Sequence, residues 1–495
     1  MKHSVRLTLC TVLALLLVLS AFCSCGTGSQ PDAATTSGGG EATGPADPSV
    51  SGTAETEGET TGTEPGTETG TETGTSGEAP LLSVVSGGSS RYQLIYTQDT
   101  PTATVMSAFL KLVNSATGCL LDFAEDTDQP ASDDSYEILI GDTNRPESQR
   151  AKAELQSGEY LMCVDGRKIV LIGSDTYSLS LAVTEFYTAA LKGTSLSVCS
   201  DYRQKGKVSW GNAEYPIAVT EQKNTEIVVY DLAKGGLTED NVIRRFPTQG
   251  FGAADTRLRE LNGKRVVLAA GGFHAFLYDY ETGETLWSYV GNLIWNAHAM
   301  ELLPNGVIAV AGSTGNNLTF FDSADPANTS PLRLEFEDAH GAVWDPTHEV
   351  LWVCGKNVMK SYRVTLTGGT IHATEQQSLT IPESGAHDLQ PVYGTPGSYW
   401  VTTSSGVYVF DSNTGRFSAI PASARLGLKA VKGIGSFPDG CIVQTIADGS
   451  YESWNTATVH FYRYNETLKI YIMTDFVSPT DAAFYKVRAW FASYS

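Results

Sequence analysis

The stretches that decide the fold are Asn296-Ala-His298-Ala-Met-Glu-Leu-Leu-Pro304, Asp338-Ala-His340-Gly-Ala-Val-Trp-Asp-Pro346 and Gly385-Ala-His387-Asp-Leu-Gln-Pro-Val-Tyr-Gly394. Each places a polar residue six or seven positions before a Pro or Gly turn, which is followed by an apolar strand, a Gly-rich turn and an aromatic strand ending near Asp. The same offset selects Arg257, Lys432 and Thr480, with steps of 41, 42, 47, 45 and 48 residues between successive positions. A period of this length is typical of the four-stranded blade of a β-propeller.

The aromatic strand gives an independent count of the repeats. It recurs at 227–231, 276–279, 318–322, 358–362, 407–411 and 459–463. We therefore predict a mainly β fold with a six-bladed β-propeller over residues 216–495. Pairing of residues 225–247 with residues 480–495 would close the ring and leave no open sheet edge. The alternative, an open β-sandwich followed by a hairpin domain, does not explain two matching sixfold counts.

Mixed helix and strand patterns over residues 81–215 predict a small α/β sandwich domain before the propeller. Residues 136–141 form a short buried-type strand, and Pro146 opens a helix that extends to Leu155. Two strands then flank the turn Asp165-Gly166-Arg167, and an amphipathic helix runs from residue 178 to residue 191.

The segments 136–144 and 158–175, followed by a helix, resemble the non-catalytic N-terminal domain of α-glucuronidases and hexosaminidases. In those enzymes the domain precedes a catalytic barrel and carries no chemistry itself, and no barrel follows here. The resemblance therefore implies a glycan-handling context for an accessory domain at 81–215. The C-terminal half is similar to uncharacterised β-propeller domains of exported bacterial proteins.

The N-terminus has the pattern of an export signal, with Lys2, His3 and Arg6 before the apolar run 7–22. Phe22-Cys23-Ser24-Cys25-Gly26 resembles a bacterial lipoprotein processing site, which implies a signal peptide over 1–25 and an acyl chain on Cys25. An ordinary cleaved signal is the alternative. We expect the protein at the cell membrane, lipid-anchored and facing the extracytoplasmic side.

Residues 26–80 are rich in Gly, Thr and Glu, with ten acidic residues and no basic one. Such a segment lacks the apolar residues for a core, so a disordered linker is predicted. As a flexible coil it reaches roughly 40 Å, enough to hold a folded body clear of the membrane.

Net charge restricts the partners. The 495 residues include 55 acidic and 33 basic ones, a formal charge of -22. Nucleic acid is excluded as the expected partner, since phosphate neutralisation needs clustered Lys and Arg. We expect a monomer.

If each repeated position begins an innermost strand, one side chain from each blade reaches the mouth of the central channel. These residues are Arg257, His298, His340, His387, Lys432 and Thr480. A cationic concave site in an acidic protein indicates an anionic ligand. We predict binding of acidic, uronate-containing glycans or their fragments, with Arg257 and Lys432 pairing an anionic group and Trp295 stacking on a sugar face.

Three alternatives remain open at this point. His298, His340 and His387 could hold a divalent metal ion, Mn or Zn. That arrangement resembles the manganese site of oligogalacturonate lyases and implies a metal-dependent polysaccharide lyase acting on uronate oligomers, although those enzymes have seven blades. A protein-interaction scaffold at the cell envelope would use the blade-top loops instead. Polar residues at strand starts also serve simply to satisfy backbone groups and waters. Whether the protein is an enzyme stays undecided.

Overall fold

The computed structural model describes residues 79–208 and 214–495. The predicted signal peptide, Cys25 and nearly all of the predicted linker lie outside the described residues. Over the part of the chain that the structure describes, no helix combines the length and apolar character needed to cross a membrane.

The first folded part contains two sheets and three helices. A six-stranded mixed sheet has the order β3-β2-β4-β6-β5-β9, and a three-stranded sheet has the order β1-β8-β7. The strands are β1 (Leu81–Val85), β2 (Gln93–Tyr96), β3 (Phe123–Glu125), β4 (Glu137–Ile140), β5 (Glu159–Asp165), β6 (Lys168–Gly173), β7 (Leu191–Lys192), β8 (Ser195–Cys199) and β9 (Arg203–Lys207). The helices are α2 (Thr100–Thr117), α3 (Pro146–Ala153) and α4 (Thr176–Ala190).

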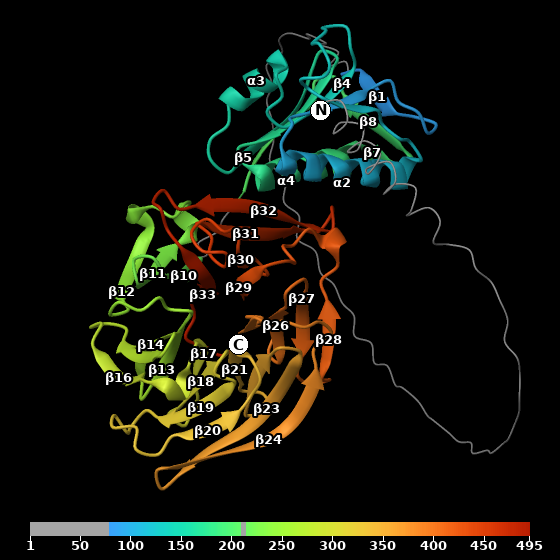
Figure 1. Ribbon diagram of the computed structural model, residues 1–495. Coiled ribbons are helices and arrows are strands. Elements are labelled where there is room, and N and C mark those ends of the chain that lie inside the picture. Colours follow the sequence, from blue (N-terminus) through green and yellow to red (C-terminus); the bar gives the residue numbers. More distant parts are fainter. Residues whose placement is uncertain (1–78, 209–213) are drawn as a thin grey trace, which may run out of the picture. The chain divides into compact units, whose positions relative to one another are not determined.

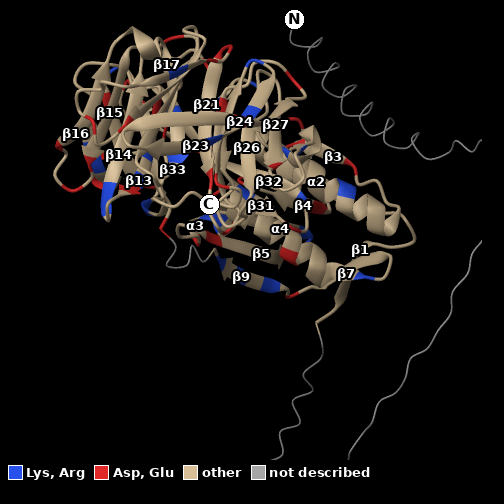
Figure 2. Cartoon of the chain, turned by 90° about the horizontal axis from the view of Figure 1, so that it is seen from below, with Lys and Arg blue, Asp and Glu red and all other residues tan. Residues whose placement is uncertain are grey.

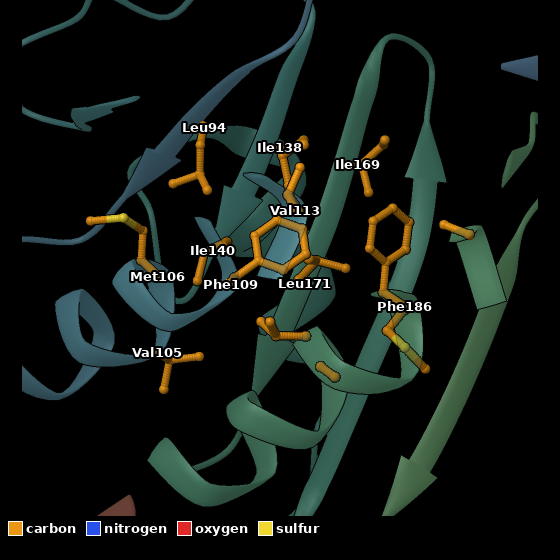
Figure 3. Packing of buried hydrophobic residues seen from close by; sticks show 14 of the residues in the cluster. Leu94, Val105, Met106, Phe109, Val113, Ile138, Ile140, Ile169, Leu171 and Phe186 are labelled. Carbon is orange, nitrogen blue, oxygen red and sulfur yellow. The ribbon is translucent and has the colours of Figure 1, made fainter. Parts of the chain in front are cut away.

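Local signals set the helix ends in this part. The Asp99 side chain accepts a hydrogen bond from the backbone N–H of Thr102 at the start of α2, and Gly118 ends that helix with a left-handed φ of 71°. Asp175 and Ser178 form a reciprocal capping box at the start of α4. Helices α2 and α4 bury their apolar residues against the large sheet, with the rings of Phe109 and Phe186 6.5 Å apart (Figure 3).

The second folded part is built from four-stranded antiparallel sheets, and the described residues form six of them. Figure 1 shows them following one another around a common centre, which is the arrangement of a β-propeller. Their orders are β12-β11-β10-β33, β13-β14-β15-β16, β17-β18-β19-β20, β21-β22-β23-β24, β25-β26-β27-β28 and β29-β30-β31-β32.

The first three sheets have these strands: β10 (Pro216–Glu221), β11 (Glu226–Asp231), β12 (Val242–Pro247) and β33 (Phe484–Ala489); β13 (Asp255–Leu261), β14 (Lys264–Gly271), β15 (His274–Asp279) and β16 (Thr285–Val290); β17 (Ala297–Leu302), β18 (Val307–Gly312), β19 (Asn317–Asp322) and β20 (Leu332–Glu335). The other three have β21 (Ala339–Asp345), β22 (Val350–Gly355), β23 (Val358–Thr367) and β24 (Thr370–Thr380); β25 (Asp388–Pro391), β26 (Ser398–Thr402), β27 (Val407–Asp411) and β28 (Arg416–Ala419); β29 (Val431–Ser436), β30 (Ile442–Ile446), β31 (Thr458–Asn465) and β32 (Ile470–Val477). Short 3-10 turns lie at Leu232–Lys234, Glu239–Asn241, Asn292–Ile294 and Ala422–Ala424.

One sheet joins the beginning of this part to its end, and the strand next to β33 is one that the sequence did not indicate. Strand β33 pairs with β10, with Val219 opposite Val487, whereas residues 225–247 form the two outer strands β11 and β12 of the same sheet. The run Ile217 to Val219 is fully buried, as an inner strand requires. Pro216 is the first residue of β10, a position where a strand tolerates the missing backbone N–H of proline. The carbonyl oxygen of Pro216 accepts a hydrogen bond from the backbone N–H of Trp490 at 2.9 Å.

Neighbouring sheets pack through apolar side chains, so that the core is divided into clusters between successive sheets. Phe320 of β19 and Trp344 of β21 belong to one such cluster, and Trp352 of β22 and Phe410 of β27 to the next. The sequence predicts packing between blades for four tryptophans, and all four are buried: Trp344, Trp352, Trp400 and Trp490.

Candidate functional site

Five side chains from different innermost strands meet where those strands begin. His298, His340 and Lys432 are the second residues of β17, β21 and β29, Tyr485 is the second residue of β33, and His387 immediately precedes β25. In β17, β21 and β29 the ladder register shifts across this residue. A bulge of this kind re-aims a side chain out of the regular alternation, which explains how three sheets deliver theirs to one place.

These side chains contact one another in a continuous series, which we call the mouth cluster. The ring centroids of His298 and His340 are 4.4 Å apart, and those of His340 and His387 are 4.7 Å apart. The ammonium group of Lys432 lies 2.7 Å from Nε2 of His387, to which it donates. At the other end of the series, the hydroxyl of Tyr485 lies 3.1 Å from Nδ1 of His298.

The electrostatic environment keeps two of the imidazoles neutral. Burial, followed by the nearby His340 and Lys486, holds the pKa of His298 well below its usual value. Burial, followed by His340 and Lys432, lowers the pKa of His387 to about 2. Burial and then Lys486 also lower the pKa of Lys432. A second cation here is therefore unfavourable, and an anion would relieve the repulsion.

Four members of the mouth cluster, His298, His387, Lys432 and Tyr485, line a pocket of about 490 Å³. A further part of the lining, which we call the wall, comes from residues 447–457, between β30 and β31, which expose the rings of Tyr451 (51%) and Trp454 (44%). This wall is tied to the closing sheet because Trp454 Nε1 and Asn455 Nδ2 both donate to Oε1 of Gln222, at 3.1 and 3.0 Å. The lining residues are Gln222, Gly252, Ala254, Gly272, Asn296, His298, His387, Lys432, Tyr451, Glu452, Trp454, Asn455 and Tyr485.

A layer of buried ion pairs lies along the same innermost strands, beyond the mouth cluster. Arg488 of β33 bonds Asp255 of β13 at 2.5 Å and Asp388 of β25 at 2.7 Å. Further along, Arg259 of β13 bonds Glu301 of β17 at 2.7 Å. The members of this ionic layer, all buried, are Asp255, Arg257, Arg259, Glu301, Asp388, Lys486 and Arg488.

The structure brings together four of the six residues that the repeats selected, His298, His340, His387 and Lys432, but it separates Arg257 from them. Arg257 belongs to the ionic layer, where its guanidinium lies 3.3 Å from Glu301 and 3.4 Å from Asp255. The residue of this sheet that is equivalent to His387 is Ala254. The backbone N–H of Ala254 donates to the carbonyl oxygen of Ala270, just as the backbone N–H of His387 donates to the carbonyl oxygen of Thr402. The offset from the turn fails here since β13 is longer than β25.

Thr480 is likewise not at the mouth. It is exposed in the loop before β33, with its hydroxyl 3.1 Å from that of Ser478, and Tyr485 occupies the position that was assigned to it. Trp295 is 54% exposed and stacks on Phe273 at a centroid distance of 6.2 Å. It is not among the lining residues, although its neighbour Asn296 is.

Sequence reasoning missed Tyr485, Tyr451 and Trp454. The signal for the two wall residues is the interval from Asp448 to Ala457, which is too long for a hairpin turn and contains Tyr451-Glu-Ser-Trp454. An aromatic pair in an extended loop beside a repeated polar position indicates a ligand surface.

The three histidines of the predicted metal site have other polar neighbours in the structure. Nε2 of His387 faces the Lys432 ammonium, and Nδ1 of His340 lies 3.0 Å from the carbonyl oxygen of Asp338. Within residues 79–208 and 214–495, no group of three or more His, Cys, Asp and Glu side chains is placed to hold a metal ion. Binding of Mn or Zn by His298, His340 and His387 stays a prediction, which elemental analysis of the purified protein tests.

Comparison with known families gives one match. The sequence pattern of a family of unknown function (DUF6528) matches residues 254–461. A search of curated proteins finds no match.

Two solved structures are similar to this chain at low identity. One is a protein of unknown function from Bacteroides caccae, with 9% identity, a TM-score of 0.41, and coverage of 56% of this chain and 98% of that one. Another is the β-propeller domain of Cps50 (Swd1) from Myceliophteria thermophila, with 11% identity, a TM-score of 0.37, and coverage of 55% and 88%. A fold does not by itself determine a function, so the ligand chemistry has to come from the site itself.

Proposed function

We propose that the six sheets are the blades of one closed six-bladed propeller, and that its mouth binds acidic glycans through a uronate carboxylate. The observation that carries this proposal is the Lys432 ammonium group, which lies in a concave pocket beside a neutral imidazole. Among the described residues, no carboxylate lies within ion-pair distance of Lys432. Lys432 is partly buried, and a partly desolvated cation without an anionic partner favours an anionic ligand.

The other lining groups suit a sugar ring. Neutral imidazoles and the Tyr485 hydroxyl both donate and accept hydrogen bonds, as hydroxyl groups of a pyranose require. The exposed faces of Trp454 and Tyr451 offer flat apolar surfaces to C–H groups of a ring. In the view of Figure 2, Lys and Arg positions are interspersed with Asp and Glu positions along the ribbon. Because the whole chain carries a formal charge of -22, long-range attraction does not select an anionic ligand and the pocket has to do so.

A direct test compares one oligosaccharide with and without its carboxylates. We expect a uronate disaccharide to bind the purified chain in titration calorimetry, and its carboxyl-reduced form, which keeps every ring and hydroxyl group, to bind at least about tenfold more weakly because the charge-assisted bond is lost. A neutral disaccharide serves as the control. Equal binding of the acid and its reduced form would contradict the proposal.

We further propose that the propeller is presented at the cell envelope through an acyl chain on Cys25. We expect Cys25→Ser to move the protein from the membrane fraction to the soluble fraction and to abolish labelling with a fatty-acid probe, because one thiol carries the lipid. Cys23→Ser is the matched control and should change neither readout. Membrane retention of the Cys25→Ser variant would argue for another anchor.

A further inference from the structure

The pocket at the mouth cluster has a closed inner end. Lys486 of β33 donates to the carbonyl oxygen of His298 in β17 at 2.9 Å, and its Nζ lies 3.4 Å from Asp388 of β25. Strands β17, β25 and β33 belong to three different sheets. Bonds between such strands have to pass across the axis around which the sheets are arranged, directly behind the imidazoles.

The next level is closed in the same way. Arg488 joins β33 to both β13 and β25, and Arg257 of β13 donates to the carbonyl oxygen of Leu389 in β25 at 3.2 Å. Strands β13 and β25 lie in sheets separated by two others along the chain. Beyond them the hydroxyl of Tyr494 donates to the carbonyl oxygen of Leu302 at 2.6 Å. Side chains therefore bridge different strands at three successive levels, through ion pairs or through bonds to backbone carbonyl groups, and leave a ligand no route through.

The entrance limits the ligand as well. A volume of about 490 Å³ lies within the range of small-molecule sites, about 300 to 1,000 Å³, rather than that of a groove for a polymer. Lys432 and His387 are partly buried at the ends of inner strands, whereas Trp454 and Tyr451 of the wall are exposed. A carboxylate on Lys432 therefore belongs to the innermost sugar, and the following sugar meets the aromatic wall.

We propose that the site binds the end of an acidic oligosaccharide, with a terminal uronate inserted carboxylate first, and does not bind the interior of a chain. This inference rests on the proposed function and adds to it the position of the bound residue in the glycan. A uronate in the interior of a chain has a sugar on each side, so its site has to be open at two ends. The ionic layer and the wall leave the pocket open at one end.

Stoichiometry tests this inference. Polygalacturonate fractions of two defined lengths are titrated with the full mature chain, and bound protein per polymer chain is measured by calorimetry and by light scattering. We expect no more than one protein per chain end at both lengths, because each chain offers the same number of ends. A bound number that increases with polymer length would overturn the inference while leaving uronate binding intact. Failure of every uronate ligand, including the disaccharide, would instead overturn the proposed function.

Substitution of the wall provides an independent readout. We expect the disaccharide to bind more tightly than the monosaccharide, and Trp454→Ala to remove most of that difference, about a tenfold effect for one stacked ring. Trp295→Ala removes an exposed Trp outside the pocket lining and should preserve the difference. Monosaccharide binding reports that the Trp454→Ala variant is folded. If Trp454→Ala leaves the difference in affinity between disaccharide and monosaccharide unchanged, the second sugar does not lie against the wall and the proposed orientation of the ligand is wrong.

Discussion

Replacing Lys432 with Met should weaken binding of a uronate disaccharide by about 30-fold or more, the largest loss that we expect from any single change at the mouth. Truncation of one partner in a buried, hydrogen-bonded charge pair costs about 2 to 5 kcal/mol, and about 1.4 kcal/mol corresponds to a factor of ten. The measurement is titration calorimetry at fixed ionic strength.

The matched control is Lys429→Met. Lys429 is exposed and precedes the same strand, so its replacement removes the same formal charge without changing the pocket. Its effect should stay within about twofold, since exposed charges are screened by salt. The carboxyl-reduced disaccharide gives the second control, because its affinity should not depend on Lys432. A uniform loss for both ligands would mean that Lys432→Met disturbs the pocket rather than the carboxylate contact.

Replacing Arg488 with Met should lower the free energy of unfolding by about 3 to 5 kcal/mol, because it leaves Asp255 and Asp388 buried without their main partner. Burial would raise the pKa of Asp255, but Arg488, Arg257 and Lys486 outweigh it and lower that pKa to about 2. The stabilisation is therefore present above the unfolded-state pKa of about 3.9 and is lost as the pH falls towards 2.

Thermal unfolding of the full chain at pH 7 measures this effect. Arg416→Met, at an exposed position on the outer strand β28, should change the stability by no more than about 0.5 kcal/mol. In the wild type, the stability should fall between about pH 4 and pH 2, and the Arg488→Met variant should lose less over that range because its carboxylates have already lost their partner. Equal stability of the Arg488→Met variant and the wild type would show that the ionic layer does not hold the inner strands together.

The sequence predicted the strands and part of the site for one physical reason, the repetition of a local pattern. His298, His340 and His387 share their spacing to a turn, so their common position could be inferred without coordinates. In the first part of the chain, Pro146 and the turn at Asp165-Gly166 were sufficient to place α3 and the β5-β6 hairpin close to their observed bounds.

The remainder depends on distances that local patterns do not encode. Tyr485 was missed because no Pro or Gly turn follows β33, so the offset could not be counted from one. Strand β10 was missed because Pro216 weakens its strand pattern. The ionic layer has a signal, since Asp255, Arg257 and Arg259 alternate along one strand and so point to one side. Their partners Glu301 and Arg488 lie far away in sequence, so the pairing itself could be recognised only in the structure.

The sheet in which β33 pairs with β10 has a consequence for how the site is made. Val219 and Val487 must find each other across more than half of the polypeptide, the slowest kind of contact to form. Tyr485, Lys486 and Arg488 enter with that strand, so the pocket acquires its floor only when the ring closes. Binding competence should therefore be acquired in a single late step of maturation, and ligand added to partly folded chains should find no receptor until that step is complete.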